Sequence, residues 1–367
     1  MNEISTAVAA TPVAAPHTFG ARSIGSVMAW VMVALAPATL FGFWLYGWPA
    51  VYLWLTTVGF TVGGEAFCLR LMGRRPGPTL LDGSAVLTGW LLAVSLPPWA
   101  PWWIGAFGGA FAAVFGKQVF GGLGQNPFNP AMVARVALLI SFPVAMTAWV
   151  APLPITDAAA PGLHQGLLIT LKGAGSFGGY DAIASASLLG YAKTELSRGV
   201  DLFQSMAHAA APAVSAGGFR QGSLGETASL LVAAGGLLLL WLRIITWHTP
   251  AAMIAGIAIP AVIGHALNPG HYLDAATHLL SGGALLGAFF IATDYVTSPN
   301  TPAGQLIFGL GVGLLTWIIR TWGGYPEGVA FAVMLMNIMT PVIDRYVKPR
   351  VFGRNRRGRP IDAQRVA

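Results

Sequence analysis

A short run of small residues, 179–190 (GYDAIASASLLG), carries side chains that could take part in covalent chemistry. It holds one acid, Asp181, and two hydroxyls, Ser185 and Ser187. A serine becomes a nucleophile when a neighbouring base activates it, and this run contains no histidine and no glycine-rich phosphate loop. Either the hydroxyls accept a group that a separate enzyme delivers, or they belong to an ordinary Ser/Ala-rich helix or loop.

A second polar stretch, 121–131 (GGLGQNPFNPA), interrupts an otherwise apolar region with Gln125, Asn126 and Asn129. Amide side chains offer both donors and acceptors, a combination that suits the edge of a flat polar heterocycle such as a flavin. Within a membrane such breaks are tolerated only where the backbone is buried in protein or lines a cavity. The alternative is an interfacial loop in which Asn129 caps the next helix and Pro130 is its first residue.

Ionisable side chains inside apolar segments are costly in lipid, and by default they mark a pathway or a buried pair. We expect Asp82 and Asp344 to lie at the membrane interface, and Arg135 to reach the interface by snorkelling. The full set within or at the ends of apolar segments is Glu65, Asp82, Arg135, His265, His278, Asp294, Glu327 and Asp344.

Four of these residues are the candidates for work inside the protein. Glu65, His278 and Asp294 lie deepest in apolar sequence, and an ion path is predicted to use Glu65, Asp294 and Glu327. Burial in ion pairs would explain the same residues equally well. No Walker A pattern and no HExxH spacing is present, so neither ATP hydrolysis nor a zinc site is predicted. No catalytic residue and no metal ligand is assigned.

The composition indicates a membrane protein. The chain is 55% hydrophobic and 9% charged, whereas a soluble domain has about 25% charged residues. Its net charge of +7 is concentrated in residues 345–367, which hold eight of the 20 basic residues. By the positive-inside rule this is a cytoplasmic tail rather than a nucleic-acid patch, so no nucleic-acid partner is expected. The single cysteine, Cys68, excludes an intrachain disulfide.

The apolar segments predict an all-α polytopic protein with about ten transmembrane helices, since a span needs roughly 20 apolar residues. The predicted spans are 24–46, 50–69, 80–96, 101–117, 130–150, 225–246, 249–267, 276–297, 303–322 and 327–345. An even number of spans puts both termini on one side, the basic tail places that side in the cytoplasm, and the long loop after the fifth span then lies on the opposite side. The predicted segments are a flexible N-terminal segment 1–20, a first repeat 21–150, an extracytoplasmic loop 151–224, a second repeat 225–345 and a basic tail 346–367.

Weak internal similarity suggests a duplication. Residues 87–101 resemble 279–299, and 121–133 resemble 323–335, because each pair runs from small residues into an apolar segment with a proline nearby. Five plus five spans of opposite orientation is the inverted-repeat plan of many transporters. We therefore expect two five-helix inverted repeats.

The run from Asp181 to Ser187 resembles the signal that periplasmic flavin transferases read: Asp, two variable residues, Ser or Thr, a small residue, Ala, and Thr or Ser. The transferase joins the phosphate of FMN to the last hydroxyl, so the acceptor needs small neighbours and no base of its own. Ala184 departs from the usual Ser or Thr, Ser185 from Gly, and Ser187 from the commoner Thr. A serine hydroxyl makes the same phosphoester, so Ser187 is the predicted acceptor and Ser185 the fallback.

Longer motifs resemble the family of the D subunit of the Rnf electron-transport complex, which is homologous to the B subunit of the sodium-pumping NADH:quinone reductase. The resemblance covers nearly all of residues 20–355. The motifs are TGWLLAVSLPP (88–98), KQVFGGLGQNPFNPAMVARVALLISFP (117–143), ATDYVTSPNTPAGQLIFG (292–309) and GGYPEGVAFAVMLMNIMTPVIDRYVKPRVFG (323–353).

The resemblance implies a fold like that of urea and ammonium channels and a place in the bacterial inner membrane, with the loop in the periplasm. It implies covalent FMN at Ser187, within the signal that begins at Asp181 and includes Ser185. It also implies a second, non-covalent flavin, riboflavin, for which Asn126 and Asn129 are the candidate contacts. The implied partners are the A, E and G subunits of the complex, with a flavin transferase for maturation.

Three functions follow from these observations. The first is a flavoprotein subunit of an enzyme complex that couples electron transfer between ferredoxin and NAD to the translocation of Na⁺ or H⁺. The second is a channel or secondary transporter without a redox centre, which the predicted repeats favour. The third is a structural scaffold for the complex.

Overall fold

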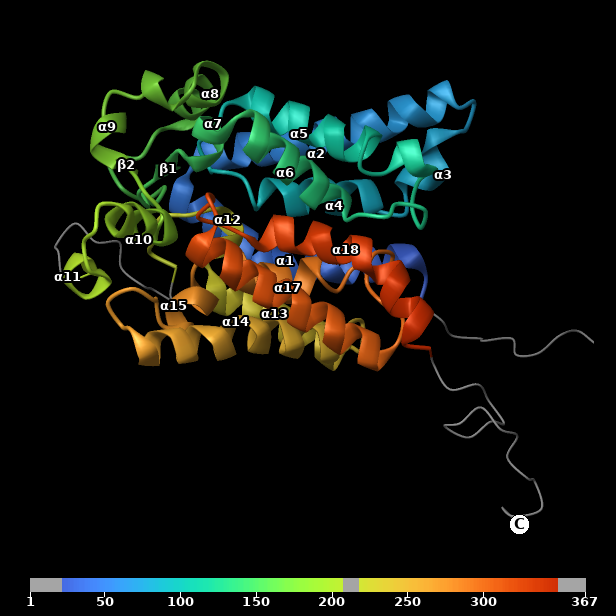
Figure 1. Cartoon of the computed structure of the whole chain (residues 1–367). Helices are drawn as coiled ribbons and strands as arrows, with labels where there is room; N and C mark the ends of the chain where they lie inside the picture. The colour runs from blue at the N-terminus through green and yellow to red at the C-terminus, as the bar shows by residue number, and fades with distance from the viewer. Residues whose placement is uncertain (1–21, 207–217, 349–367) are drawn as a thin grey trace, which may run out of the picture.

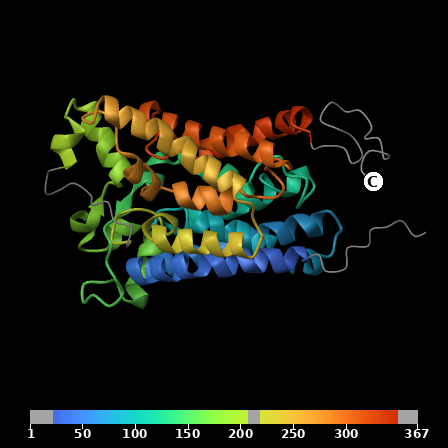
Figure 2. The ribbon, with the colours of Figure 1, turned by 90° about the horizontal axis from the view of Figure 1, so that it is seen from below.

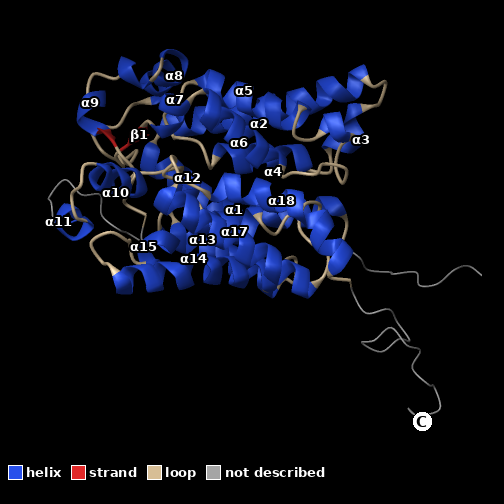
Figure 3. Cartoon of the chain, viewed as in Figure 1, coloured by secondary structure: helices blue, strands red, loops and turns tan. Residues whose placement is uncertain are grey.

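The computed structural model describes residues 22–206 and 218–348. The predicted N-terminal segment 1–20 and the tail beyond 348 therefore lie outside the described residues. The described chain is mostly helical (Figure 3), as the all-α prediction requires. Its one strand pairing is short, since β1 (Trp149–Val150) pairs antiparallel with β2 (Ala184–Ser185).

The first half of the bundle is held together by close contacts between glycine and threonine. A side chain at Gly105 or Gly109 would meet Thr57 of the neighbouring helix at 2.5 Å, so only glycine lets α5 approach α2 this closely. The helices of this half are α1 (Ile24–Tyr46), α2 (Trp48–Leu71), α3 (Pro76–Leu80), α4 (Ser84–Ala93), α5 (Trp102–Val114), η1 (Gln118–Phe120), α6 (Pro130–Ser141) and α7 (Pro143–Thr147).

The second half contains a similar pair. A Cβ on Gly256 of α14 would lie 2.6 Å from the carbonyl oxygen of Leu310, so α14 packs closely against α17. The pairs α2–α5 and α14–α17 hold corresponding places in the two halves, while the inverted orientation of the halves stays a prediction. The elements are α12 (Leu224–Thr227), α13 (Ser229–Trp241), α14 (His248–Leu267), α15 (Ala275–Leu280), α16 (Ala284–Leu286), η3 (Gly287–Ile291), α17 (Pro302–Trp322) and α18 (Val329–Tyr346).

Several predicted spans are shorter or broken. Four described helices, α1, α14, α17 and α18, are long and apolar enough to cross a membrane. The prediction of one helix over 276–297 is wrong, because α15, α16 and the π-helical η3 replace it. Gly282 adopts a φ of +64° between the first two of these pieces. Broken membrane helices occur where the freed backbone lines a cavity or is buried in protein.

The predicted loop 151–224 is partly folded. It contains α8 (Leu163–Lys172), η2 (Ala174–Ser176), α9 (Tyr180–Ile183), α10 (Leu188–Ser197) and α11 (Leu202–Met206). These helices gather at one end of the bundle, which we call the loop end (Figure 1). The start of α1 and the end of α18 lie at the opposite end, as Figure 2 also shows. Both described ends of the chain are therefore on one side, and the cytoplasmic identity of that side stays a prediction.

The loop-end segment is attached to both halves. The amides of Leu153 and Ile155 donate to the carbonyls of Leu45 and Trp44 at the end of α1, at 3.0 and 2.8 Å. On the other side, the amide of Leu202 donates to the carbonyl of Gly270 at 2.8 Å. The segment therefore joins the first half to the loop between α14 and α15.

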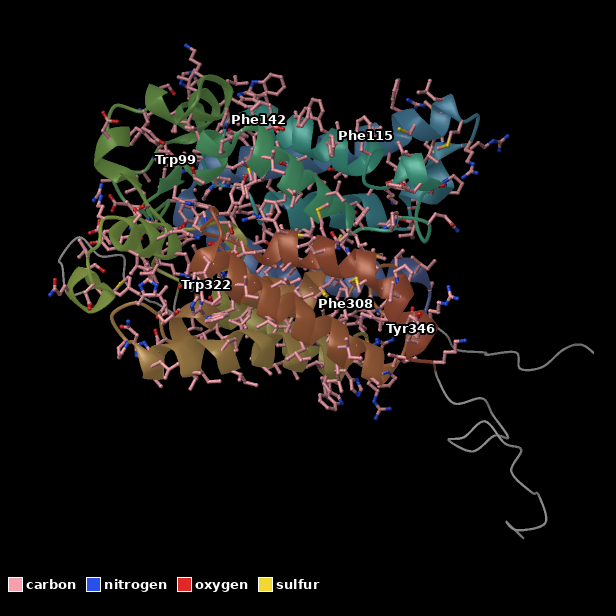
Figure 4. All side chains as sticks on the ribbon, in the orientation of Figure 1. Trp99, Phe115, Phe142, Phe308, Trp322 and Tyr346 are labelled. Carbon is pink, nitrogen blue, oxygen red and sulfur yellow. The ribbon has the colours of Figure 1, made fainter. Side chains whose placement is uncertain are left out.

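Aromatic side chains mark both ends of the bundle. Trp322 lies towards the loop end and Tyr346 at the opposite end, whereas Phe308 is enclosed by the helices (Figure 4). Trp322 and Tyr346 are 59% and 78% exposed. Exposed Trp and Tyr at the two ends of a helical bundle are typical of residues at the two membrane–water interfaces.

Candidate functional site

A cavity of about 470 Å³ lies between the two halves, towards the end where α1 begins. Its walls are mainly apolar, and five elements contribute to them: α1, α4, α6, α13 and η3. Polar groups reach it from the residues before α1, from α4, from the break before α6 and from the residues after η3. These polar side chains are Arg22, Ser84, Thr88, Lys117, Asn126, Asn129, Thr293, Asp294 and Tyr295.

The two predicted amides both line this cavity. Asn129 caps α6, because its Oδ1 accepts from the amides of Ala131 and Met132 at 3.1 and 3.3 Å. The capping interpretation of Asn129 is thus confirmed, with Pro130 as the first helical residue. Asn126 donates to the carbonyl of Phe128, but its buried Oδ1 has no partner among the described residues. A buried acceptor without a donor is a place where a ligand can bind.

Asp294 lies beside these amides. Its Oδ2 accepts from Asn129 Nδ2 at 3.3 Å and from Thr297 Oγ1 at 3.2 Å, and its Oδ1 accepts from the amide of Val296. No ion pair of Asp294 is present within residues 22–206 and 218–348. The structure therefore brings one predicted ion-path residue together with the predicted flavin contacts.

Glu65, by contrast, is held in a buried ion pair. Its two oxygens lie 2.8 and 2.9 Å from Lys117 Nζ, and Gln118 donates to it at 2.8 Å. Lys117 also donates to Ser84 Oγ at 2.6 Å, and Lys117 and Ser84 face the cavity while Glu65 does not. Pairing, the alternative to an ion path, is thus present at Glu65.

A second polar cluster lies near the loop end and is buried. Glu327 pairs with Arg320 at 3.0 Å and accepts from three backbone amides, those of Gly283, Gly328 and Val329. Glu327, the third predicted ion-path residue, is therefore also paired. His278 lies beside this pair, since Arg320 donates to its carbonyl oxygen.

The expectation that Arg135 snorkels is wrong. Arg135 is only 6% exposed, and its Nη2 lies 3.9 Å from Glu226 Oε1 on α12. Arg135 lies in the middle of α6, which packs inside the bundle, so a protein carboxylate rather than the membrane surface is its partner. Sequence reasoning missed both Glu226 and its neighbour Arg220, which is 4% exposed.

Ser187, the predicted FMN acceptor, is the N-cap of α10. Its Oγ accepts from the amide of Gly190 at 3.3 Å, and the residue is half-buried. It lines a small cavity of about 20 Å³ together with Arg220, Glu226 and Glu327. The predicted acceptor and a predicted ion-path residue thus share one site at the loop end.

The other residues of the predicted transferase signal lie close by in the chain. Asp181 is exposed at the first turn of α9. Ser185 belongs to β2, where its backbone pairs with Trp149, and its side chain lies outside the described residues. The structure therefore places Ser187 in a described site.

Lys193 connects α10 to the end of α17. Its ammonium donates to the carbonyls of Ile319, Arg320 and Tyr325 at 3.3, 3.2 and 3.0 Å. Partial burial lowers the pKa of Lys193. A lysine at the end of a helix both satisfies free carbonyls and complements the helix dipole. The helix that begins at Ser187 is therefore anchored beside Arg320.

These features are typical of one class of protein, helical membrane proteins with broken helices around a cavity between two halves. The chain belongs to the NQR2, RnfD, RnfE family, whose sequence model matches residues 11–353. This membership confirms the family that the sequence motifs predicted.

Individual relatives match over most of their length. The chain is 50% identical to a Halorhodospira halophila protein, named as the D subunit of an ion-translocating oxidoreductase complex, over 353 residues, 96% of this chain and 98% of the relative. A Stutzerimonas stutzeri protein of the same name is 51% identical over 341 residues, 93% and 95% of the two chains. One from Rhodobacter capsulatus is 46% identical over 308 residues, 84% and 85% of the two chains.

Proposed function

We propose that this chain is the membrane flavoprotein component, the D subunit, of an ion-translocating oxidoreductase complex of the bacterial inner membrane. It carries FMN as a phosphoester on Ser187 and binds riboflavin in the large cavity. The observation that carries the proposal is the place of Ser187. The residue ends a match to the transferase signal, is half-buried and therefore reachable, and lies at the loop end with its Oγ at a helix N-terminus.

The large cavity fits a flavin ring. Its volume of about 470 Å³ falls within the roughly 300–1,000 Å³ of small-molecule sites. Phe289 and Phe290 offer apolar wall, and the free Oδ1 of Asn126 can accept from a ring N–H. The Oδ1 of Asn129 caps α6 and one of its N–H groups goes to Asp294, so Asn129 would hold the edge of the ring through its second N–H. A flavin bound here supplies electron transfer, while these residues orient the ring and exclude water.

Ion translocation is assigned to the polar groups inside the bundle. Asp294 borders the flavin cavity and has no paired cation in the described part of the chain, so it is the group best placed to bind Na⁺ or H⁺ there. Glu65 and Glu327 lie in ion pairs, and they take part in a path only if those pairs open. We place both termini in the cytoplasm and the loop end in the periplasm.

The chain works with partners. We propose contacts with the A, E and G subunits of the complex, electron exchange between ferredoxin and NAD by the whole assembly, and attachment of FMN by a flavin transferase. The apolar exposed faces of the long helices contact membrane lipid.

The test is a denaturing gel of the purified chain under ultraviolet light, followed by peptide mass spectrometry. We expect fluorescence on the chain and the mass of FMN minus water on the peptide that contains Ser187. Ser187→Ala should abolish this fluorescence, and Ser197→Ala, an exposed serine on the same helix, should leave it unchanged. A colourless chain from a host that has the transferase, with no bound flavin of either kind, would favour the transporter function that the cavity also allows.

A further inference from the structure

We infer that Arg220 binds the phosphate of the FMN phosphoester on Ser187, an inference that rests on the proposed function. The small cavity at the loop end contains both residues in its lining. Flavin attachment through a phosphate creates a permanent anion at this point, and the chain supplies a buried cation beside it. Arg220 is thus a cofactor-binding residue that the sequence motifs do not indicate.

The hydrogen bonds of Arg220 leave one of its nitrogens free. Nη2 donates to the carbonyl oxygen of Glu226 and to Ser229 Oγ. Nη1 is buried and has no partner among residues 22–206 and 218–348, and the same is true of Ser281 Oγ, which lines the same cavity. A buried donor without an acceptor is costly. Two such donors beside Ser187 fit an incoming group rich in acceptor oxygens.

The net charge of the buried cluster favours the binding of one anion. Three guanidinium groups, those of Arg135, Arg220 and Arg320, face two carboxylates, those of Glu226 and Glu327. With the carboxylates ionised, the cluster keeps one positive charge. A phosphate esterified on both sides carries one negative charge, so the modification neutralises the cluster. Charge-assisted bonds from arginine to phosphate are among the stronger hydrogen bonds in proteins.

Arg220 is a better fit than the neighbouring Arg320. Both terminal nitrogens of Arg320 already donate, to Glu327 and to the carbonyls of His278 and Ser281. Only its Nε has no partner among the described residues, and Arg320 does not line this cavity. The N-terminus of α10, which has ten residues, adds amide groups that favour an anion at Ser187. The phosphate would therefore lie between the start of α10 and the free edge of Arg220.

The small volume of the loop-end cavity limits which part of FMN can enter it. Its volume of about 20 Å³ is close to the ~10–15 Å³ that one water molecule occupies on this measure. The isoalloxazine ring cannot enter, so only phosphate oxygens reach Arg220, and the ring lies outside on the surface of the loop end. This leaves the ring available to a partner protein.

The experiment compares the full chain purified from hosts with and without the flavin transferase. Mass spectrometry first shows whether Ser187 of the wild type carries FMN. Thermal unfolding then measures the gain in Tm on flavin attachment for the wild type, for Arg220→Gln and for Arg198→Gln. The last is a control that removes the same kind of side chain from the exposed end of α10, outside the buried cluster and outside the lining of this cavity. We expect a gain of roughly 3–6 °C in the wild type and in the control, and its loss in Arg220→Gln.

A lower Tm of Arg220→Gln that is equal in both forms would show a purely structural role and would overturn the inference. If this variant does not fold, the ³¹P resonance of the wild type carries the test. We expect it to be shifted from that of the isolated flavin peptide, and a peptide-like resonance would overturn the inference. Absence of FMN from wild-type Ser187 would instead refute the proposed function, and the inference with it.

Discussion

Replacing Glu65 by glutamine removes the negative charge that holds Lys117 inside the bundle. Lys117 is 2% exposed, and its ammonium has only Glu65 and Ser84 as hydrogen-bond partners in the described structure. Glutamine keeps the shape of the side chain, so the perturbation is almost purely electrostatic. Lys117 must then lose its proton, draw in water or move towards the cavity that it borders.

The magnitude follows from the burial of both partners. Breaking a buried ion pair by removing one charge typically costs about 3–5 kcal/mol, because the other charge stays buried without a partner. Glu65 is also fully buried and accepts from Gln118, so solvent screening gives little relief. We therefore expect the upper half of this range for Glu65→Gln. The double variant with Lys117→Met should recover most of the loss, because neither charge remains.

The assay is equilibrium unfolding in mixed micelles, followed by tryptophan fluorescence, on the four chains of a double-mutant cycle. The expected coupling energy between Glu65 and Lys117 is at least about 2 kcal/mol. Additive effects within about 0.5 kcal/mol would refute the pair. Measuring ion translocation by the reconstituted complex then distinguishes a structural role of Glu65 from a role in transport. A stable double variant that still translocates shows that Glu65 only pairs, whereas a stable but inactive one places Glu65 in the ion path.

Further predictions concern the cavity, the helix packing and the loop end. Asn126→Ala should lower riboflavin occupancy by about 5–30-fold, because one buried acceptor is lost. The occupancy is measured as flavin released from the purified chain. Gln125→Ala, at a residue that does not line the cavity, should leave it unchanged. Gly256→Ala should cost about 1–3 kcal/mol of unfolding free energy, because its Cβ meets the backbone of Leu310, while Gly59→Ala, with nothing within 4 Å, should be neutral. Lys193→Met should speed proteolysis within α10 about tenfold, and a rate equal to that of Lys172→Met, an exposed lysine, would contradict the anchoring of α10 on α17.

Local features of this fold could be predicted from the sequence. The capping of α6 by Asn129 needs only the residues next to it, and the long spans of α1, α14, α17 and α18 follow from composition alone. The breaks at Gly282 and around the π-helical η3 could not, because an apolar segment of suitable length looks the same whether its helix is continuous or broken.

The polar clusters show the limit of sequence reasoning more clearly. Glu65 and Glu327 stand out because charge is costly in lipid, but the sequence does not show that Lys117 and Arg320 neutralise them. Glu226 lies at the start of a predicted span, where a charged residue is usually interfacial, and only the packing of α12 reveals its burial. Which residues form ion pairs across long distances in the chain depends on tertiary packing, and a local sequence pattern does not show it.

The attachment of the loop-end segment to both halves has a mechanical consequence. Hydrogen bonds tie it to the end of α1 through Leu153 and to the second half through Leu202 and Lys193. Rotation of one half against the other at the loop end would therefore have to break or strain these hydrogen bonds. At the far end the hydrogen bond from Asn129 to Asp294 also joins the two halves, so a motion that widens the large cavity would have to break it.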